Sequence, residues 1–212
     1  TKEKLLNETN SDLIDIFVAD LSDFNELKKA SNKLIENYDR LNLLINNAGI
    51  MAPPRSLSEQ GFELQFAVNH LAHMFLTKKL LCLLTKNKGS RIVTVSSGVQ
   101  YFAKINWDDL NSENNYNRWA AYSQSKLANV MFALHLNDIL KTENNSPISL
   151  LAHPGFSKTN LQLNSIKTNN YLHEPLAYLL INPLFQTAYM GALPQIMAST
   201  IPIAKGGEQY GP

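Results

Sequence analysis

Four short apolar segments, separated by longer segments with helical periodicity, constrain most strongly how this chain can fold. The apolar segments are residues 13–19, 41–45, 92–95 and 148–152. They are continuous rather than alternating, which is typical of strands buried on both faces of a parallel sheet. The helical segments are residues 22–35, 61–84 and 119–140, and Ser22 has the residue type of an N-cap. This pattern predicts an α/β fold, a doubly wound parallel sheet covered by helices on both faces.

Composition limits the classes of partner. A chain of 212 residues is long enough for one domain with a full core. Its formal net charge is +1 and it has no basic block, so we expect no nucleic acid partner. Cys82 is the only cysteine, which excludes a disulfide within the chain and is compatible with the reducing cytoplasm. No apolar run is long enough to predict a transmembrane segment in this chain.

Polar residues and glycines follow each predicted strand. These residues are Asp20, Asn47, Gly49, Ser97, Pro154 and Gly155. Parallel sheets bind ligands at the carboxyl ends of their strands, so we expect several of these residues to meet in one site.

Tyr122 and Lys126 are the candidate acid/base pair, because they lie one helical turn apart in the segment 119–140. A free tyrosine has a pKa near 10, and a neighbouring cation can lower it by roughly 1–3 units. Taken singly, such motifs are common. Tyr122 could be a surface residue beside a solvated lysine, residues 46–49 could be a simple turn, and Asn69 could lie on an exposed helix face.

In chain order, however, these motifs resemble the short-chain dehydrogenase/reductase family, over essentially the whole chain. The resemblance implies a Rossmann-type fold in which Tyr122 is the catalytic acid/base, Lys126 its partner and Ser97 the substrate-orienting residue. Asn69 would complete the tetrad by holding a water that links Lys126 to solvent. The implied contacts to NADP or NAD are Asp20, Leu21, Asn47, Ala48, Gly49, Tyr122, Lys126, Pro154, Gly155, Ser157 and Thr159.

Residues 66–73 resemble the retinol dehydrogenase-like and WW-domain oxidoreductase-like branch of that family. The implied substrate is a small carbonyl compound or alcohol, of lipophilic character, bound under a variable lid at residues 157–202. An alternative is a non-catalytic cofactor-binding or interaction protein on the same fold. The family also pairs its two long helices across a two-fold axis, which implies a homodimer.

The chain departs from the family at its ends. The family's glycine-rich turn should precede Asp20, yet the first glycine of the chain is Gly49. Residues 206–210 look like the start of the family's last strand. We therefore expect residues 1–212 to be one partial domain of a longer protein. Expressed alone, these 212 residues should not bind NAD or NADP.

His70 and His73 lie three residues apart and could form a metal pair, but the remaining ligands are missing from the sequence nearby. We interpret them as helix-face histidines and expect no metal.

Overall fold

The computed structural model describes residues 2–141, 146–157 and 185–212. Its centre is a parallel sheet with the strand order β1-β2-β3-β4. The strands are β1 (Leu43–Asn46), β2 (Arg91–Val95), β3 (Ile148–Ala152) and β4 (Gln209–Tyr210). Three of them lie where apolar runs predicted strands, and β4 lies in the predicted last strand. The predicted α/β fold with a parallel sheet is confirmed.

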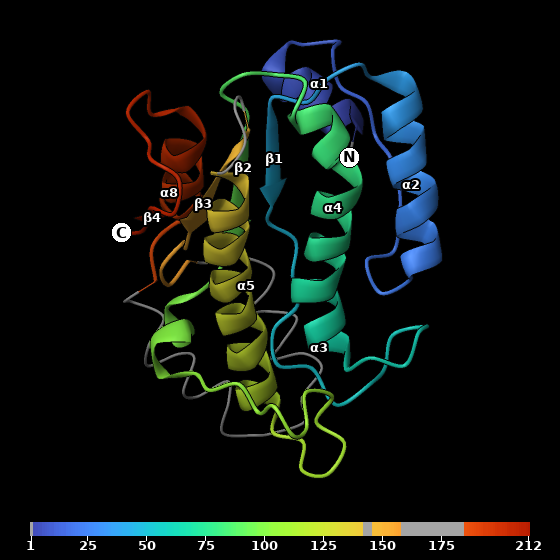
Figure 1. Ribbon diagram of the computed structural model, residues 1–212, viewed down its shortest axis with the longest axis vertical. Coiled ribbons are helices and arrows are strands. Elements are labelled where there is room, and N and C mark those ends of the chain that lie inside the picture. The colour runs from blue at the N-terminus through green and yellow to red at the C-terminus, as the bar shows by residue number, and fades with distance from the viewer. Residues whose placement is uncertain (1, 142–145, 158–184) are drawn as a thin grey trace.

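Helices cover both faces of this sheet, as Figure 1 shows. One face carries α4 (Ala72–Leu84) and α5 (Arg118–Leu140), and its core joins Ile92 to Leu84 and Leu140. The other face carries α8 (Ala188–Thr200), where Ala198 packs with Val93 and Leu150. A buried face on each side is the reason that the strands are continuously apolar.

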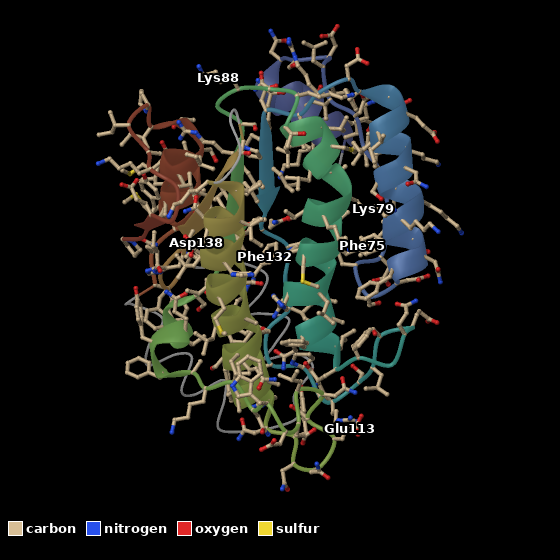
Figure 2. The ribbon with its side chains drawn as sticks, in the orientation of Figure 1. Phe75, Lys79, Lys88, Glu113, Phe132 and Asp138 are labelled. Carbon is tan, nitrogen blue, oxygen red and sulfur yellow. The ribbon has the colours of Figure 1, made fainter. Side chains whose placement is uncertain are left out.

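Two side-chain contacts fix the outer elements. Helix α2 (Phe24–Asn37) lies alongside α4, and Phe75 of α4 stacks on Phe24 with ring centroids 5.8 Å apart (Figures 1 and 2). The guanidinium of Arg91 donates to the carbonyls of Ala198 and Ile201 at 2.9 and 2.7 Å. This cation satisfies the last carbonyls of α8 and ties that helix to β2. A short helix, α1 (Lys2–Thr9), begins the described chain.

The prediction of a strand at residues 13–19 was wrong. This segment has no regular secondary structure, and Leu13 and Val18 are 90% and 89% exposed. A strand needs a hydrogen-bonded neighbour, and no described residue pairs with this segment. The predicted N-cap was also wrong by one residue. Asp23 caps α2 by accepting from the Asn25 amide, whereas Ser22 donates its hydroxyl to Asp20.

The predicted helix 61–84 begins three residues later, at Leu64, and runs without a gap to Leu84, but it is not α-helical throughout. Gly61 lies in a turn with φ of 82°, and Glu63 caps the short helix α3 (Leu64–Phe66). A π-helical turn, η1 (Ala67–Leu71), then leads into α4. Such turns occur frequently at functional sites. A 3-10 helix, η2 (Gly98–Phe102), follows β2.

Candidate active site

Tyr122 and Ser97 meet where β2 ends beside α5. Tyr122 is 4% exposed, which excludes its interpretation as a surface residue. Burial raises the pKa of Tyr122, and a hydrogen bond with the Ser97 side chain lowers it. Burial is the larger effect, so the phenol keeps its proton at neutral pH. In the protein alone, burial therefore outweighs any effect of Lys126 on this pKa, and the lowering expected from Lys126 together with an oxidised nicotinamide stays a prediction for the complex.

Lys126 lies one turn further along α5, with Nζ 5.8 Å from the centre of the Tyr122 ring. It is 4% exposed, and burial lowers its pKa to about 8. Nζ donates to the Val95 carbonyl over a long 3.4 Å. The backbone carbonyl of Lys126 accepts from the Ser96 hydroxyl at 2.8 Å. Ser96 therefore holds α5 against the end of β2.

Asn69 is fully buried in the π-helical turn, not on an exposed helix face. Its Oδ1 accepts from the Ile50 amide at 2.8 Å, and its Nδ2 donates to the Ile50 carbonyl at 3.0 Å. The same Nδ2 donates to the Ser125 hydroxyl at 2.9 Å. One amide thus joins the loop after β1 to α5.

Two residues of this network were not predicted, Ser125 and Asn129. Asn129 is buried, and its Nδ2 donates to the carbonyls of Asn69 and Val95 at 2.9 and 3.2 Å. It fixes the backbone of η1 against the end of β2. They lie three and seven positions after Tyr122 and so share its helix face, but in the sequence this spacing is equally consistent with exposed positions.

The described cofactor residues predicted outside the tetrad lie in three places: after β1, after β3, and at Asp20 and Leu21. Gly49 lies within the tetrad, since a Cβ there would be 3.0 Å from Asn69 Oδ1 and 3.5 Å from Lys126 Nζ. Asn47 and Ala48 are exposed beside it at the end of β1. Only a residue without a side chain fits this approach without displacing the tetrad.

At the end of β3, the Pro154 carbonyl accepts from the Ser157 hydroxyl at 2.8 Å. Gly155 has a φ of 62°, a conformation that favours glycine. The Asp20 carboxylate instead accepts from the Ser22 amide and hydroxyl, at 2.7 and 2.8 Å. No described contact joins Asp20 or Leu21 to the tetrad. Thr159 and most of the predicted lid lie outside the described residues.

The described residues contain no cluster of three or more histidine, cysteine, aspartate or glutamate side chains that could hold a metal ion. His70 instead pairs with Asn129, at 3.1 Å between Nδ1 and Oδ1. In the same part of the chain, no helix has the length and apolarity needed to span a bilayer.

Comparison with known proteins gives one consistent family. Over 202 residues the chain is 39% identical to human retinol dehydrogenase 14, covering 91% of this chain and 56% of that protein. It is 35% identical over 208 residues to human polyprenol dehydrogenase, covering 96% of this chain and 62% of that protein. The chain therefore spans little more than half the length of these relatives.

Solved structures share the fold. A protein of unassigned function from Mycobacterium paratuberculosis superposes with a TM-score of 0.75 and 32% identity, over 100% of this chain and 67% of that one. A short chain dehydrogenase from Burkholderia cenocepacia, solved with NADP, has a TM-score of 0.63 at 19% identity, over 91% of this chain and 72% of that one. The latter likeness shows a shared fold. The family model for short chain dehydrogenases matches residues 1–170. The chain belongs to the short chain dehydrogenase family.

Proposed function

We propose that the protein is an NAD(P)-dependent oxidoreductase that interconverts an alcohol and a carbonyl compound. The central observation is the buried Tyr122 side chain, hydrogen-bonded to Ser97 with Lys126 one turn away. Two relatives named as dehydrogenases and a bacterial structure solved with NADP support the proposal.

The nicotinamide end of such a cofactor fits the described residues. Gly49 lets the backbone after β1 come close to Asn69 and Lys126, and Pro154 and Gly155 form the loop after β3. The Lys126 ammonium has three N–H donors but, among described residues, one long hydrogen bond, so it can bind ribose hydroxyls. When bound, the nicotinamide would donate or accept hydride. A glycine-rich turn for the pyrophosphate does not occur in these 212 residues.

The protein's own groups perform the proton transfer. In reduction, Ser97 binds the carbonyl oxygen and orients it toward Tyr122. Tyr122 gives its proton to that oxygen as the carbon is reduced, acting as a general acid that its raised pKa keeps protonated. The Lys126 charge, held in a buried site, stabilises the tyrosinate that remains. In oxidation, the same groups act in reverse.

The substrate we propose is a lipophilic alcohol or its carbonyl product. A hollow of about 620 Å³ adjoins the site, and its lining mixes apolar side chains, among them Phe102, Ile105 and Trp119, with polar ones such as Lys104 and Gln124. Trp119 packs edge-on against the Tyr122 ring at 6.4 Å, which connects this hollow to the reactive tyrosine. Retinol and polyprenol, named in the two human relatives, are both apolar isoprenoid alcohols.

Purified full-length protein, incubated with NADPH and a panel of carbonyl compounds, tests both parts by loss of NADPH absorbance. We expect apolar, long-chain aldehydes and ketones to be reduced faster than short polar ones. Faster turnover of polar compounds would contradict the substrate class alone. A folded protein that binds NADPH and reduces nothing would contradict the enzymatic function and favour the non-catalytic alternative.

We also propose a homodimer formed through the outer faces of α4 and α5. Met74, Met131 and Leu134 are each at least 40% exposed on these two helices, and burying them would favour association. Light scattering of the full-length protein should give twice the monomer mass, and a monomer mass at every concentration would contradict the proposal. The cytoplasmic location stays a prediction from cysteine usage.

A further inference from the structure

Three buried polar atoms near the tetrad have no hydrogen-bond partner within the described residues. They are Nδ1 and Nε2 of His73 and Oγ1 of Thr94. His73 is 2% exposed and Thr94 is fully buried. Buried polar groups in folded proteins are nearly always paired, with protein or with ordered water, because an unpaired one costs about 1–3 kcal/mol.

The fold places these atoms on one side of the sheet. Thr94 lies beside Asn46 in the register of β2 with β1, so both side chains point to the same face. The Asn46 amide donates to the Thr77 hydroxyl of α4 at 2.9 Å, which identifies that face as the one under α4. His73 lies one turn before Thr77 on the same helix stripe, and one turn after Asn69.

The same space adjoins the catalytic lysine. Lys126 Nζ and Asn129 Nδ2 both donate to the carbonyl of Val95, the residue after Thr94, and Asn129 also donates to the carbonyl of Asn69, one turn before His73. Burial lowers the pKa of His73 to about 3, and the nearby Lys126 charge adds to that shift. The Asn69 carbonyl has the opposite effect and raises the pKa of His73. The hydrogen bond that this carbonyl accepts, however, comes from the Asn129 side chain. His70 of η1 is the other titratable group that lowers the pKa of His73. The side chains that β1 and β2 place on this face of the sheet, Asn46 and Thr94, are neutral.

His73 is consequently neutral at physiological pH, with one ring nitrogen donating and the other accepting. A neutral imidazole can therefore hold a water on each side and orient both. The Lys126 ammonium has three N–H donors and its one described bond, to Val95, is long, so a donor remains for this water beside a ribose contact.

We propose that His73 and Thr94 hold ordered water behind Lys126, and that His73 is a positioning residue for proton transfer through that lysine. The inference rests on the proposed function and extends the tetrad by a fifth side chain. After Tyr122 has given up its proton, Lys126 passes a proton toward the tyrosinate and regains one from this water. The water in turn takes a proton from bulk solvent through further water, so no hydroxide remains in the site. His73 holds the water oxygen in line with the ammonium and keeps its own protons.

A crystal structure of the full-length protein at high resolution tests the water directly. We expect a water within hydrogen-bonding distance of a His73 ring nitrogen, linked through water to Thr94 Oγ1 or Lys126 Nζ. Apolar contacts around the whole ring, or protein partners for both nitrogens, would overturn the proposal. The crystal structure shows whether the water is present even if the protein has no turnover. Failure of this proposal can therefore be distinguished from failure of the proposed function.

Kinetics of variants test the positioning role. In His73→Leu we expect kcat at pH 7 to fall about tenfold, as for loss of one hydrogen bond to a charged group, with little change in KM. Without that bond the ammonium is less favoured, so the acid limb of the oxidation pH profile should move to higher pH. His73→Gln or His73→Asn, which keep a donor and an acceptor, should restore most of the rate.

Thr77→Val is the matched control, because it removes a paired polar group from the same buried stripe. It should lower the melting temperature and leave the pH profile unchanged. An unchanged profile in His73→Leu, or an equal shift in Thr77→Val, would overturn the role of His73. If His73→Leu does not fold, the Gln and Asn variants test the role of His73. A folded variant that lacks the ordered water but keeps the normal pH profile of oxidation would overturn that role.

Discussion

Lys126→Met should make the folded protein more stable at pH 7 while removing its catalytic group. The structure holds an ammonium at 4% exposure and lowers its pKa from 10.5 to about 8. That difference corresponds to about 3 kcal/mol by which the charged form disfavours folding. Methionine has a similar length and no charge to desolvate, so the variant should gain most of this free energy.

The pH dependence gives the sign. The folded state favours the neutral amine, so the penalty is complete below pH 8, shrinks as the pH rises from 8 to 10.5, and vanishes above. Urea unfolding of both proteins at several pH values measures this, because other titrating groups are common to both. We expect Lys126→Met to be about 3 kcal/mol more stable at pH 7 and nearly equal at pH 10.5. A less stable variant, or a difference that does not change with pH, would refute the reasoning.

Two further substitutions test the packing of the site. Asn69→Ala removes three hydrogen bonds, to the backbone of Ile50 and to Ser125, and should cost about 2–4 kcal/mol in urea unfolding; a loss below about 1 kcal/mol would show that the loop is held by other contacts. Gly191→Ala places a Cβ 2.1 Å from the Ser157 hydroxyl, so α8 should shift from β3, with a loss of about 1–3 kcal/mol by thermal melting. An unchanged melting temperature in that variant would contradict the close packing of Gly191 against Ser157.

The sequence predicted well where burial alone decides the structure. The run 148–152 coincides with β3, and the segment 119–140 with α5 to within one residue. Local chemistry was less decisive. Ser22 and Asp23 are both good N-caps, and the choice depended on Asp20, whose carboxylate takes the Ser22 hydroxyl.

Tertiary context explains the errors and omissions. Residues 13–19 have strand propensity, but pairing depends on a neighbour that propensity does not show. The π-helical turn at Ala67–Leu71 leaves no periodic signal distinct from an α-helix over so few residues. Asn129 and His73 became informative only when the fold placed them against Asn69 and Lys126. Their spacing alone is equally consistent with exposed helix positions.

The most direct test of the account is Tyr122→Phe in the full-length protein, with turnover and NADPH binding measured on the same sample. The substitution removes one hydroxyl and little volume from a buried site. We predict that turnover falls by about 10²–10⁴ or more, while cofactor affinity and melting temperature stay nearly unchanged. Tyr38→Phe, the same change at the C-cap of α2, is the control. Near-normal turnover in Tyr122→Phe would contradict the central claim that this tyrosine transfers the proton.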